Sequence, residues 1–322
     1  MWNRLKWFTT PNGKYTMGVI ATVGACSVFT VTYLPKSIFI DKYYDFVTMR
    51  KYNEPVPVSP HLQKLWTEVL DDLNLSKFYK ALLKPFMVFG FDVWHEGSLR
   101  TKYGSIIGLP INFTYYDTES IDKEQIILNN GPVNWNQDEA QKLLESFLLS
   151  DDSKKYAIAR EILMTDNYNI IIQSVGSSML TGGVYILSAH LNESLSMFDK
   201  PRTIRVFMYL VIVTFFWGIW AMQKDILTKK YESSVDEKIS QLGVKYVKGA
   251  IEFYDKMLQR NIALRTLLGT QGEGLFTVKG NENFIIRMKR LPITHRKNFF
   301  EEKLKNLESS TSINNDSTLY SK

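Results

Sequence analysis

Residues 206–223 read VFMYLVIVTFFWGIWAMQ, a stretch without a charged side chain. An α-helix of this length measures about 27 Å, close to the thickness of the hydrocarbon core of a bilayer. Arg202 and Lys224 flank the stretch, and Trp217 and Trp220 near its end are typical of a membrane–water interface. The stretch therefore predicts a transmembrane helix, and with it an integral membrane protein.

A second uncharged stretch lies near the N-terminus. Residues 15–34 read YTMGVIATVGACSVFTVTYL, between Lys14 and Lys36. A buried core helix would usually show a polar face, and this stretch offers little beyond Thr and Ser. A cleaved signal peptide would have a shorter apolar core and a small-residue cleavage site, which Thr-Tyr-Leu-Pro does not supply. The prediction is a second transmembrane helix.

A third and more dilute apolar stretch covers residues 169–191. It contains no Asp, Glu, Lys or Arg, but Gln173 and His190 lower its hydrophobicity. Small residues such as Ser178 and Gly182 would let another helix approach closely. The favoured interpretation is a transmembrane hairpin with the span that follows, and the alternative is a buried helix of a soluble domain.

The number of spans decides where the polar parts lie. With three spans, residues 35–168 and 223–322 face the same side of the membrane, and with two spans they are separated. Short apolar runs broken by Gly and Pro between 85 and 135 predict strands. The predicted fold class is an α-helical membrane protein with three transmembrane helices and an α+β soluble domain. The parts expected besides the spans are a short basic N-terminus (1–14), a linker (35–60), the α+β domain (61–166), a C-terminal helical domain (224–306) and a disordered polar tail (307–322).

Composition argues against several kinds of site. The chain carries 39 Lys and Arg against 33 Asp and Glu, and its C-terminal bases are mixed with acids, so nucleic-acid binding is not expected. The one cysteine, Cys26, excludes a disulfide within the chain and a multi-cysteine metal site. The histidines are not paired at helical spacing, and the glycines within 269–274 lack a following Gly-Lys-Ser/Thr. Neither a metal nor another cofactor is predicted.

One arrangement resembles the membrane gluzincin metallopeptidases. In those enzymes a His-Glu-x-x-His helix, a membrane segment and a downstream Glu-x-x-x-Asp supply the zinc ligands and the general base. Here the helix predicted at 154–166 has Arg160 and Glu161 at the start of the first motif and a Met in place of its second His, while Glu232 and Asp236 stand at the second motif. Arginine is a permanent cation and cannot bind zinc, so the resemblance implies a degenerate gluzincin without catalysis.

These four residues are expected to form a structural ion-pair cluster: Arg160, Glu161, Glu232 and Asp236. In this interpretation Arg160 pairs with Glu232 or Asp236, and an ion pair replaces the metal cross-link. The alternative is coincidence, because Arg-Glu is a common pair on a helix.

Four blocks of sequence resemble the transmembrane protein 177 family. The longest covers 249–296 and contains GAIEFYDKMLQRNIALRTLLGTQGEGLFTVKGN, followed by FIIRMKRLPITHR. The others are IGLPINF at 107–113, GPVNW at 131–135 and KYAIARE at 155–161. The blocks occur in the family's order, and the predicted spans fall in the expected places.

That resemblance implies a multi-pass protein of the mitochondrial inner membrane, which fits the basic and acid-free N-terminus. It also implies a non-catalytic accessory factor that binds and stabilises newly made cytochrome c oxidase subunit II together with that subunit's assembly chaperone. The alternatives are a membrane metallopeptidase-like enzyme and a scaffold for another membrane complex.

Within the longest block, four residues are candidates for contact with a partner: Glu252, Tyr254, Asp255 and Arg265. The alternative is that these residues pack the C-terminal domain.

Overall fold

The chain forms two compact units, each assembled from two separate stretches of sequence. A computed structural model describes residues 7–128, 131–284 and 286–319. Met1–Tyr43 and Tyr168–Leu227 form one unit, which we call the membrane unit. Tyr44–Asn167 and Thr228–Lys322 form the other, which we call the extramembrane unit.

Three helices of the chain are long and apolar enough to cross a membrane: α2 (Pro11–Tyr33), α8 (Asn169–Ser194) and α9 (Arg202–Ser240). A short 3-10 helix, η1 (Trp7–Thr9), precedes α2, and another, η4 (Met197–Asp199), separates α8 from α9. The structure thus confirms the predicted fold class, since each predicted span lies within one of these helices, except that the first extends one residue past the C-terminal end of α2.

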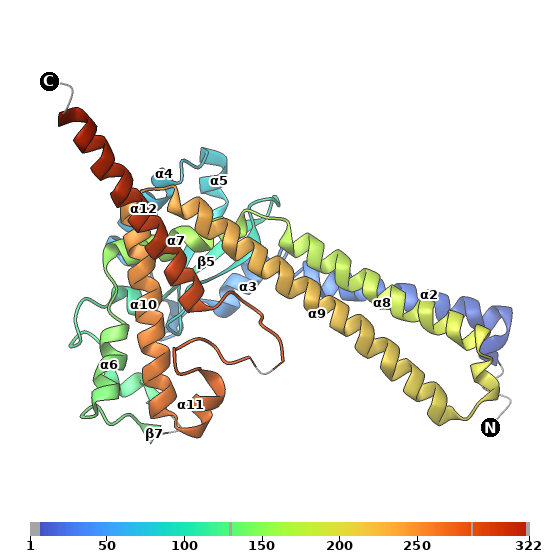
Figure 1. The fold of residues 1–322 in the computed structure, drawn as a ribbon. Helices are drawn as coiled ribbons and strands as arrows, with labels where there is room; N and C mark the ends of the chain where they lie inside the picture. Colours follow the sequence, from blue (N-terminus) through green and yellow to red (C-terminus); the bar gives the residue numbers. More distant parts are fainter. Residues whose placement is uncertain (1–6, 129–130, 285, 320–322) are drawn as a thin grey trace. The chain divides into compact units, whose positions relative to one another are not determined.

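Small residues allow the helices of the membrane unit to approach one another, and Figure 1 shows α2 and α8 side by side. Ser178 on α8 donates a hydrogen bond of 2.8 Å to the carbonyl oxygen of Ala25 on α2. A Cβ atom at Gly183 on α8 would lie 2.7 Å from the ring of Phe216 on α9. The small residues of α8 that were expected to admit another helix are therefore partly used by the chain's own helices.

Large apolar side chains cover the outer face of α9. The most exposed of them in its apolar half are Phe207, Met222, Leu210, Phe215 and Trp217. A soluble protein would rarely expose so continuous an apolar surface, whereas lipid solvates it without cost. This exposure agrees with a helix that lies in a bilayer.

A small mixed sheet lies in the extramembrane unit. Its strand order is β3 (Leu83–Val88), β5 (Gly104–Pro110), β4 (Trp94–Ser98), with β3 parallel and β4 antiparallel to the central β5. Every residue of β5 is buried, as expected of a strand covered on both faces. Two short hairpins complete the strands: β1 (Arg50–Lys51) with β2 (Glu54–Pro55), and β6 (Ile127–Leu128) with β7 (Gly131–Pro132).

Helices make up most of the rest of the chain. They are α3 (Ile40–Val47), α4 (Pro60–Asp72), α5 (Lys77–Ala81), α6 (Asp138–Ser146), α7 (Asp151–Thr165), α10 (Val244–Leu267), α11 (Thr270–Leu275) and α12 (Ile293–Leu319), with 3-10 helices η2 (Ile111–Thr114) and η3 (Lys123–Gln125). Helix α7 is the centre of the extramembrane unit, because Tyr156, Ala157, Ile158 and Ile162 are fully buried around its circumference. In Figure 1, α10 and α12 run close to α7.

The helices after the last span differ from the sequence-based boundaries. Helix α9 continues from the apolar stretch to Ser240 without a break. The break falls at Gly243, whose φ of +116° is a conformation that side-chain-bearing residues rarely adopt. At the other end, α12 extends to Leu319, so the polar tail predicted to be disordered is helical that far, and residues 320–322 lie outside the described residues.

The two stretches of the extramembrane unit meet where α7 packs against α10. A Cβ atom at Gly249 on α10 would lie 2.3 Å from the carbonyl oxygen of Asp152 on α7. The hydroxyls of Tyr156 and Tyr254 on the same two helices are 2.6 Å apart. Such contacts require both stretches to lie on one side of the membrane, so the chain crosses an even number of times between them. Helices α8 and α9 supply two crossings, and the two-span alternative does not allow this packing.

We expect the substitution Gly249→Ala to lower the free energy of unfolding by about 1–3 kcal/mol, because backbone atoms must move to admit the methyl group. Thermal unfolding of the full-length protein in detergent measures the loss. Gly274→Ala is the matched control, since a Cβ atom there meets nothing within 4 Å. Equal melting temperatures for the two variants would contradict the close contact.

The three-crossing topology predicts which segments share a side. Tags in the exposed turn at 117–120 and at the C-terminus should become accessible to protease from the same side of a sealed vesicle, and a tag within 195–201 from the other side. Digestion of all three tags from one side, or separation of the first two, would show that α8 does not cross.

Candidate functional site

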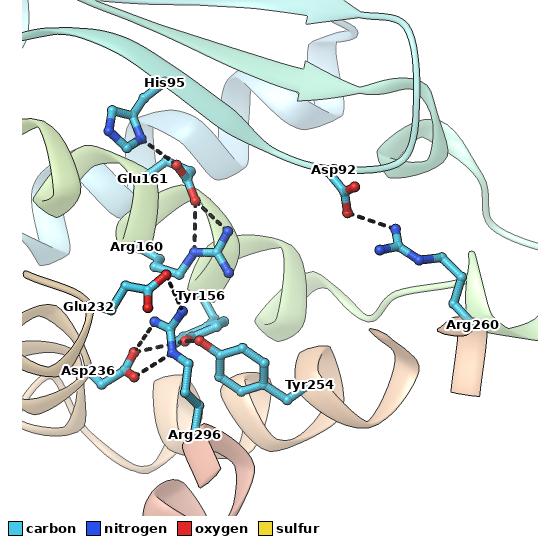
Figure 2. Close-up of polar contacts among 10 residues, drawn as sticks. All are labelled: Asp92, His95, Tyr156, Arg160, Glu161, Glu232, Asp236, Tyr254, Arg260 and Arg296. Atoms are coloured by element: carbon cyan, nitrogen blue, oxygen red, sulfur yellow. Dashed lines mark hydrogen bonds and ion pairs between the residues drawn. The ribbon is translucent and has the colours of Figure 1, made fainter. Parts of the chain in front are cut away.

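The extramembrane unit contains a group of buried ionisable side chains, shown in Figure 2. We call it the charge cluster. Its charged or titratable members are His95, Arg160, Glu161, Glu232, Asp236 and Arg296, and two tyrosines, Tyr156 and Tyr254, complete it. The members come from β4, α7, α9, α10 and α12, so the cluster joins elements far apart in the sequence.

Helix geometry places the side chains on common faces. Tyr156 and Arg160 are four residues apart on α7, and Glu232 and Asp236 are four residues apart on α9, so each pair shares a face. Helix α7 begins at Ser150, whose hydroxyl caps it by accepting a hydrogen bond from the amide of Ser153. The residue at which α7 begins therefore helps to set which of its side chains, Tyr156 and Arg160 among them, face the charge cluster.

The first ion pair joins neighbouring residues of α7. Arg160 donates from Nε to Glu161 Oε1 at 2.8 Å and also from Nη2 to the same oxygen. His95 Nδ1 lies 2.5 Å from Glu161 Oε2. An ionised carboxylate only accepts hydrogen bonds, so the proton of this contact belongs to Nδ1. The guanidinium of Arg160 also stacks 5.2 Å from the centre of the Phe253 ring.

Burial and pairing act in opposite directions on this ion pair. Burial disfavours the charged form of Glu161, but Arg160 and the hydrogen bond with His95 outweigh it and lower the pKa of Glu161 to about 2. Burial likewise opposes the charge of Arg160, and Glu161 holds the pKa of Arg160 above its ordinary value. Both groups are therefore ionised at neutral pH, and each depends on the other.

The second ion pair lies between α9 and α12. Arg296 donates from Nε and Nη2 to the two oxygens of Asp236, at 2.7 and 2.6 Å, in a bidentate arrangement. Glu232 lies 3.7 Å from Arg296 Nη1, and its Oε2 accepts from the amide of Leu291 at 2.8 Å. These contacts fix the start of α12, together with the residues just before it, on the end of α9.

Two buried tyrosines lie between the ion pairs. The hydroxyl of Tyr156 is within hydrogen-bond distance of Tyr254 and of Asp236 Oδ1, at 2.6 and 3.3 Å. The ring of Tyr254 lies 5.0 Å from the guanidinium of Arg296. Burial raises the pKa of Tyr254 to about 12, and it raises that of Tyr156 well above its ordinary value. Both tyrosines are therefore neutral donors and acceptors that connect the charged groups.

In this arrangement each acid has a cation beside it. Glu161 is neutralised within the first stretch of the unit, and Asp236 and Glu232 within the second. Within residues 7–128, 131–284 and 286–319, no group of three or more His, Cys, Asp or Glu side chains could hold a metal ion. The geometry is suited to holding helices together, because breaking a buried pair leaves an uncompensated charge.

The pairing differs from the one predicted from the sequence. Arg160 was expected to pair with Glu232 or Asp236, and the structure pairs it with Glu161 instead. Arg296 takes the place expected of Arg160, because the first turn of α12 packs on the end of α9.

All four candidate partner residues have contacts inside the unit. Glu252 accepts hydrogen bonds from the amide and hydroxyl of Ser150, and Asp255 pairs with Lys297 at 2.6 Å. Tyr254 is almost fully buried, so it offers no surface to a partner in this structure. The fourth candidate, Arg265, donates to the carbonyl oxygen of Phe276 at 2.8 Å. These contacts fit the alternative that the four residues pack the C-terminal domain.

Two members of the cluster were missed in the sequence. His95 is partly buried, and nothing in its neighbourhood in the sequence marked it as a partner of Glu161. Arg296 carried a signal, since it stands four residues before Phe300 and so shares a helical face with a fully buried aromatic ring. An arginine on the apolar face of a helix indicates a buried acid opposite it.

Comparison with known proteins identifies a family whose members resemble this chain. A family model described as Transmembrane protein 177 matches residues 88–299, which include the whole charge cluster and both helices of the α8–α9 hairpin. The chain belongs to the transmembrane protein 177 family.

Curated relatives agree with this membership. The chain is 30% identical over 246 residues to the rat protein named Transmembrane protein 177, a match that covers 76% of this chain and 78% of the relative. It is 30% identical to the mouse protein of that name over 77% of this chain and 80% of the relative, and 30% identical to the human one over 76% and 78%. No solved structure matches the chain.

The substitution Glu161→Gln should lower the free energy of unfolding by about 3–5 kcal/mol, because it leaves Arg160 buried without an anion. The double variant Arg160→Met, Glu161→Gln should lose less than the single variant, since both charges are gone. Unfolding of the full-length protein in detergent measures both. Glu273→Gln, at a surface pair with Arg265, is the control and should cost less than about 1 kcal/mol.

The same comparison has a defined pH dependence. The pKa of Glu161 is lower in the folded protein than its ordinary value of 4.5, so its contribution is full above that pH and is lost as the pH falls towards 2. The stability difference between the natural protein and Glu161→Gln should therefore shrink over this range. A difference that stays constant down to the folded-state pKa would show that Glu161 is not held ionised by Arg160.

Proposed function

We propose that this protein is a non-catalytic accessory factor of the mitochondrial inner membrane. It binds newly made cytochrome c oxidase subunit II, together with that subunit's assembly chaperone, and stabilises the subunit until its partners arrive. A multi-pass anchor keeps the factor in the membrane into which the client is inserted, and the extramembrane unit supplies a surface for the client's polar part.

Two lines of reasoning support the location and the client. Membership of the transmembrane protein 177 family is consistent with both, as the sequence resemblance implies. The N-terminal segment before the first span carries Arg4, Lys6 and Lys14 and no acid, as expected of a protein sent to mitochondria.

The observation that best supports the non-catalytic role is the ion pair between Arg160 and Glu161. In the peptidases that this part of the chain resembles, the residue before the catalytic glutamate binds zinc. Here that residue is Arg160, which forms an ion pair with Glu161, and Glu161 is further held by His95. A glutamate bound on both oxygens and kept ionised beside a fixed cation is poorly placed to act as a general base with pKa near neutral pH.

The test is recovery of the client. A tagged form of the protein, purified from detergent-solubilised mitochondria after a short pulse of mitochondrial translation, should retain labelled subunit II and its chaperone. The label should leave the complex during a chase, because the subunit passes on to its partners. A second multi-pass inner-membrane protein with the same tag serves as the control.

Two other results would replace the proposal. Chelator-sensitive cleavage of a peptide by the purified protein, lost in Glu161→Gln, would favour a metallopeptidase-like enzyme. Recovery of an unrelated set of membrane proteins, with labelled subunit II absent, would favour a scaffold for another complex.

A further inference from the structure

An exposed part of the extramembrane unit combines apolar and basic side chains. It consists of Val278, Lys279 and residues 286–290, and we call it the basic-apolar loop. Ile286 is 93% exposed, Val278 76% and Met288 49%. Lys279, Lys289 and Arg290 are also exposed. Apolar side chains this open to water are unusual, and here each has a cation within one or two residues in the sequence.

The loop is exposed although it is firmly attached on both sides. Gly280, beside the first part, takes a φ of +79° where a Cβ atom would lie 2.7 Å from the carbonyl oxygen of Leu258, and its own carbonyl oxygen accepts from Asn261 at 2.8 Å. After the second part, the amide of Leu291 donates to Glu232 at 2.8 Å. Val278 and Ile286 are therefore exposed although the segments beside them are fixed to the rest of the unit.

Charge favours an anionic partner. Residues 276–292 contain four bases, Lys279, Arg287, Lys289 and Arg290, against one acid, Glu282. Near a membrane with anionic lipids, each basic side chain favours the bound state about fivefold. Single apolar side chains among such bases are the pattern of segments that lie in the headgroup region, with the apolar groups about 5–10 Å into the boundary with the acyl chains.

Chain length permits contact between the loop and the bilayer. Glu232, which accepts from the amide of Leu291, follows Lys224, the first charge after the apolar stretch of α9, by eight residues of helix, or about 12 Å of rise. Residues 286–290, which precede Leu291, can extend over about 17 Å. The tether between Ile286 and the apolar stretch is therefore long enough for insertion.

Connectivity favours lipid over an acidic protein as the occupant. The extramembrane unit is joined by chain to α2, α8 and α9, so it stays beside one membrane surface and meets it at a high effective concentration. A protein partner would have to compete with that surface for the same bases.

We propose that the basic-apolar loop inserts into the headgroup region of the membrane that holds the three spans. Ile286, Met288 and Val278 enter the boundary with the acyl chains, and Lys279, Lys289 and Arg290 bind the phosphate groups of anionic phospholipids. The contact sets the orientation of the extramembrane unit on the membrane and does not depend on which client the protein binds.

A fluorophore at the loop tests the insertion. The chain has one cysteine, so Cys26→Ser with Ile286→Cys gives a single site for an environment-sensitive label on the full-length protein. In vesicles with about a third of the lipid as phosphatidylglycerol, the emission should shift to the blue and lipids brominated on the acyl chain should quench it. In pure phosphatidylcholine vesicles, or at about 1 M salt, where the Debye length is about 3 Å, both effects should weaken.

Two further proteins complete the experiment. Charge reversal by Lys289→Glu with Arg290→Glu should lower the ratio of inserted to free loop at least about thirtyfold, from about fivefold per base. A label at Ile127→Cys, an exposed isoleucine beside the acidic residues Asp122 and Glu124, should report water in all vesicles. The proposal would be overturned if the label at 286 showed no more blue shift or quenching than the label at 127. It would also be overturned if quenching at 286 were unchanged by the lipid charge and by the charge reversal.

Discussion

The fold depends on one topological constraint, which is that two stretches of chain separated by the α8–α9 hairpin must pack together on the same side of a membrane. The contact between α7 and α10 admits no side chain at Gly249, and the hydroxyls of Tyr156 and Tyr254 meet in the interior. Both contacts require an even number of membrane crossings between the two stretches, and a hairpin that crosses and returns supplies two. The membrane spans therefore do more than anchor the protein, because they bring the two parts of its hydrophobic core to one place.

The charge cluster follows the same division. Arg160, Glu161 and His95 all belong to the first stretch, whereas Arg296, Asp236 and Glu232 belong to the second. What joins them is the neutral hydroxyl of Tyr156, which is within hydrogen-bond distance of Tyr254 and Asp236. Arg160 is thus paired inside the first stretch, and Arg296 is shared by two acids inside the second. Within the charge cluster the two stretches meet through the tyrosine hydroxyls, and away from it an ion pair of Arg260 with the exposed Asp92 also joins them. Desolvation at that interface is cheaper than burial of an unpaired ion would be.

Elements defined by a local pattern of apolar and charged residues could be predicted from the sequence. Contacts between residues far apart in the chain could not. The spans could be predicted because charge is absent for eighteen or more residues in a row, and β3 and β5 because they contain the apolar runs that Gly and Pro break up. Strand β4 has the sequence WHEGS, which is not an apolar run, and part of the predicted strand region forms the 3-10 helices η2 and η3. The sequence-based boundary at 223 is not a helix boundary, because 224–242 contains neither Gly nor Pro and α9 continues to Ser240. The partner of Arg160 could not be predicted, because several acids compete for one cation and only the way the helices cross decides between them. The contact of His95 with Glu161 could not be predicted for a similar reason, because α7 lies more than sixty residues away in the sequence.

The split construction of the extramembrane unit also governs how the protein can be made. The first stretch ends at Asn167, and the second stretch, whose helices cover α7, does not begin until Thr228. At common rates of synthesis of about 5–20 residues per second, α7 would wait several seconds for α10 and longer for α12. During that interval the residues of α7 that α10 and α12 bury in the folded protein, among them Tyr156, lack their cover. Maturation of this protein is thus tied to insertion of its own hairpin, and a failure of insertion would release an uncovered core to proteases and holding chaperones.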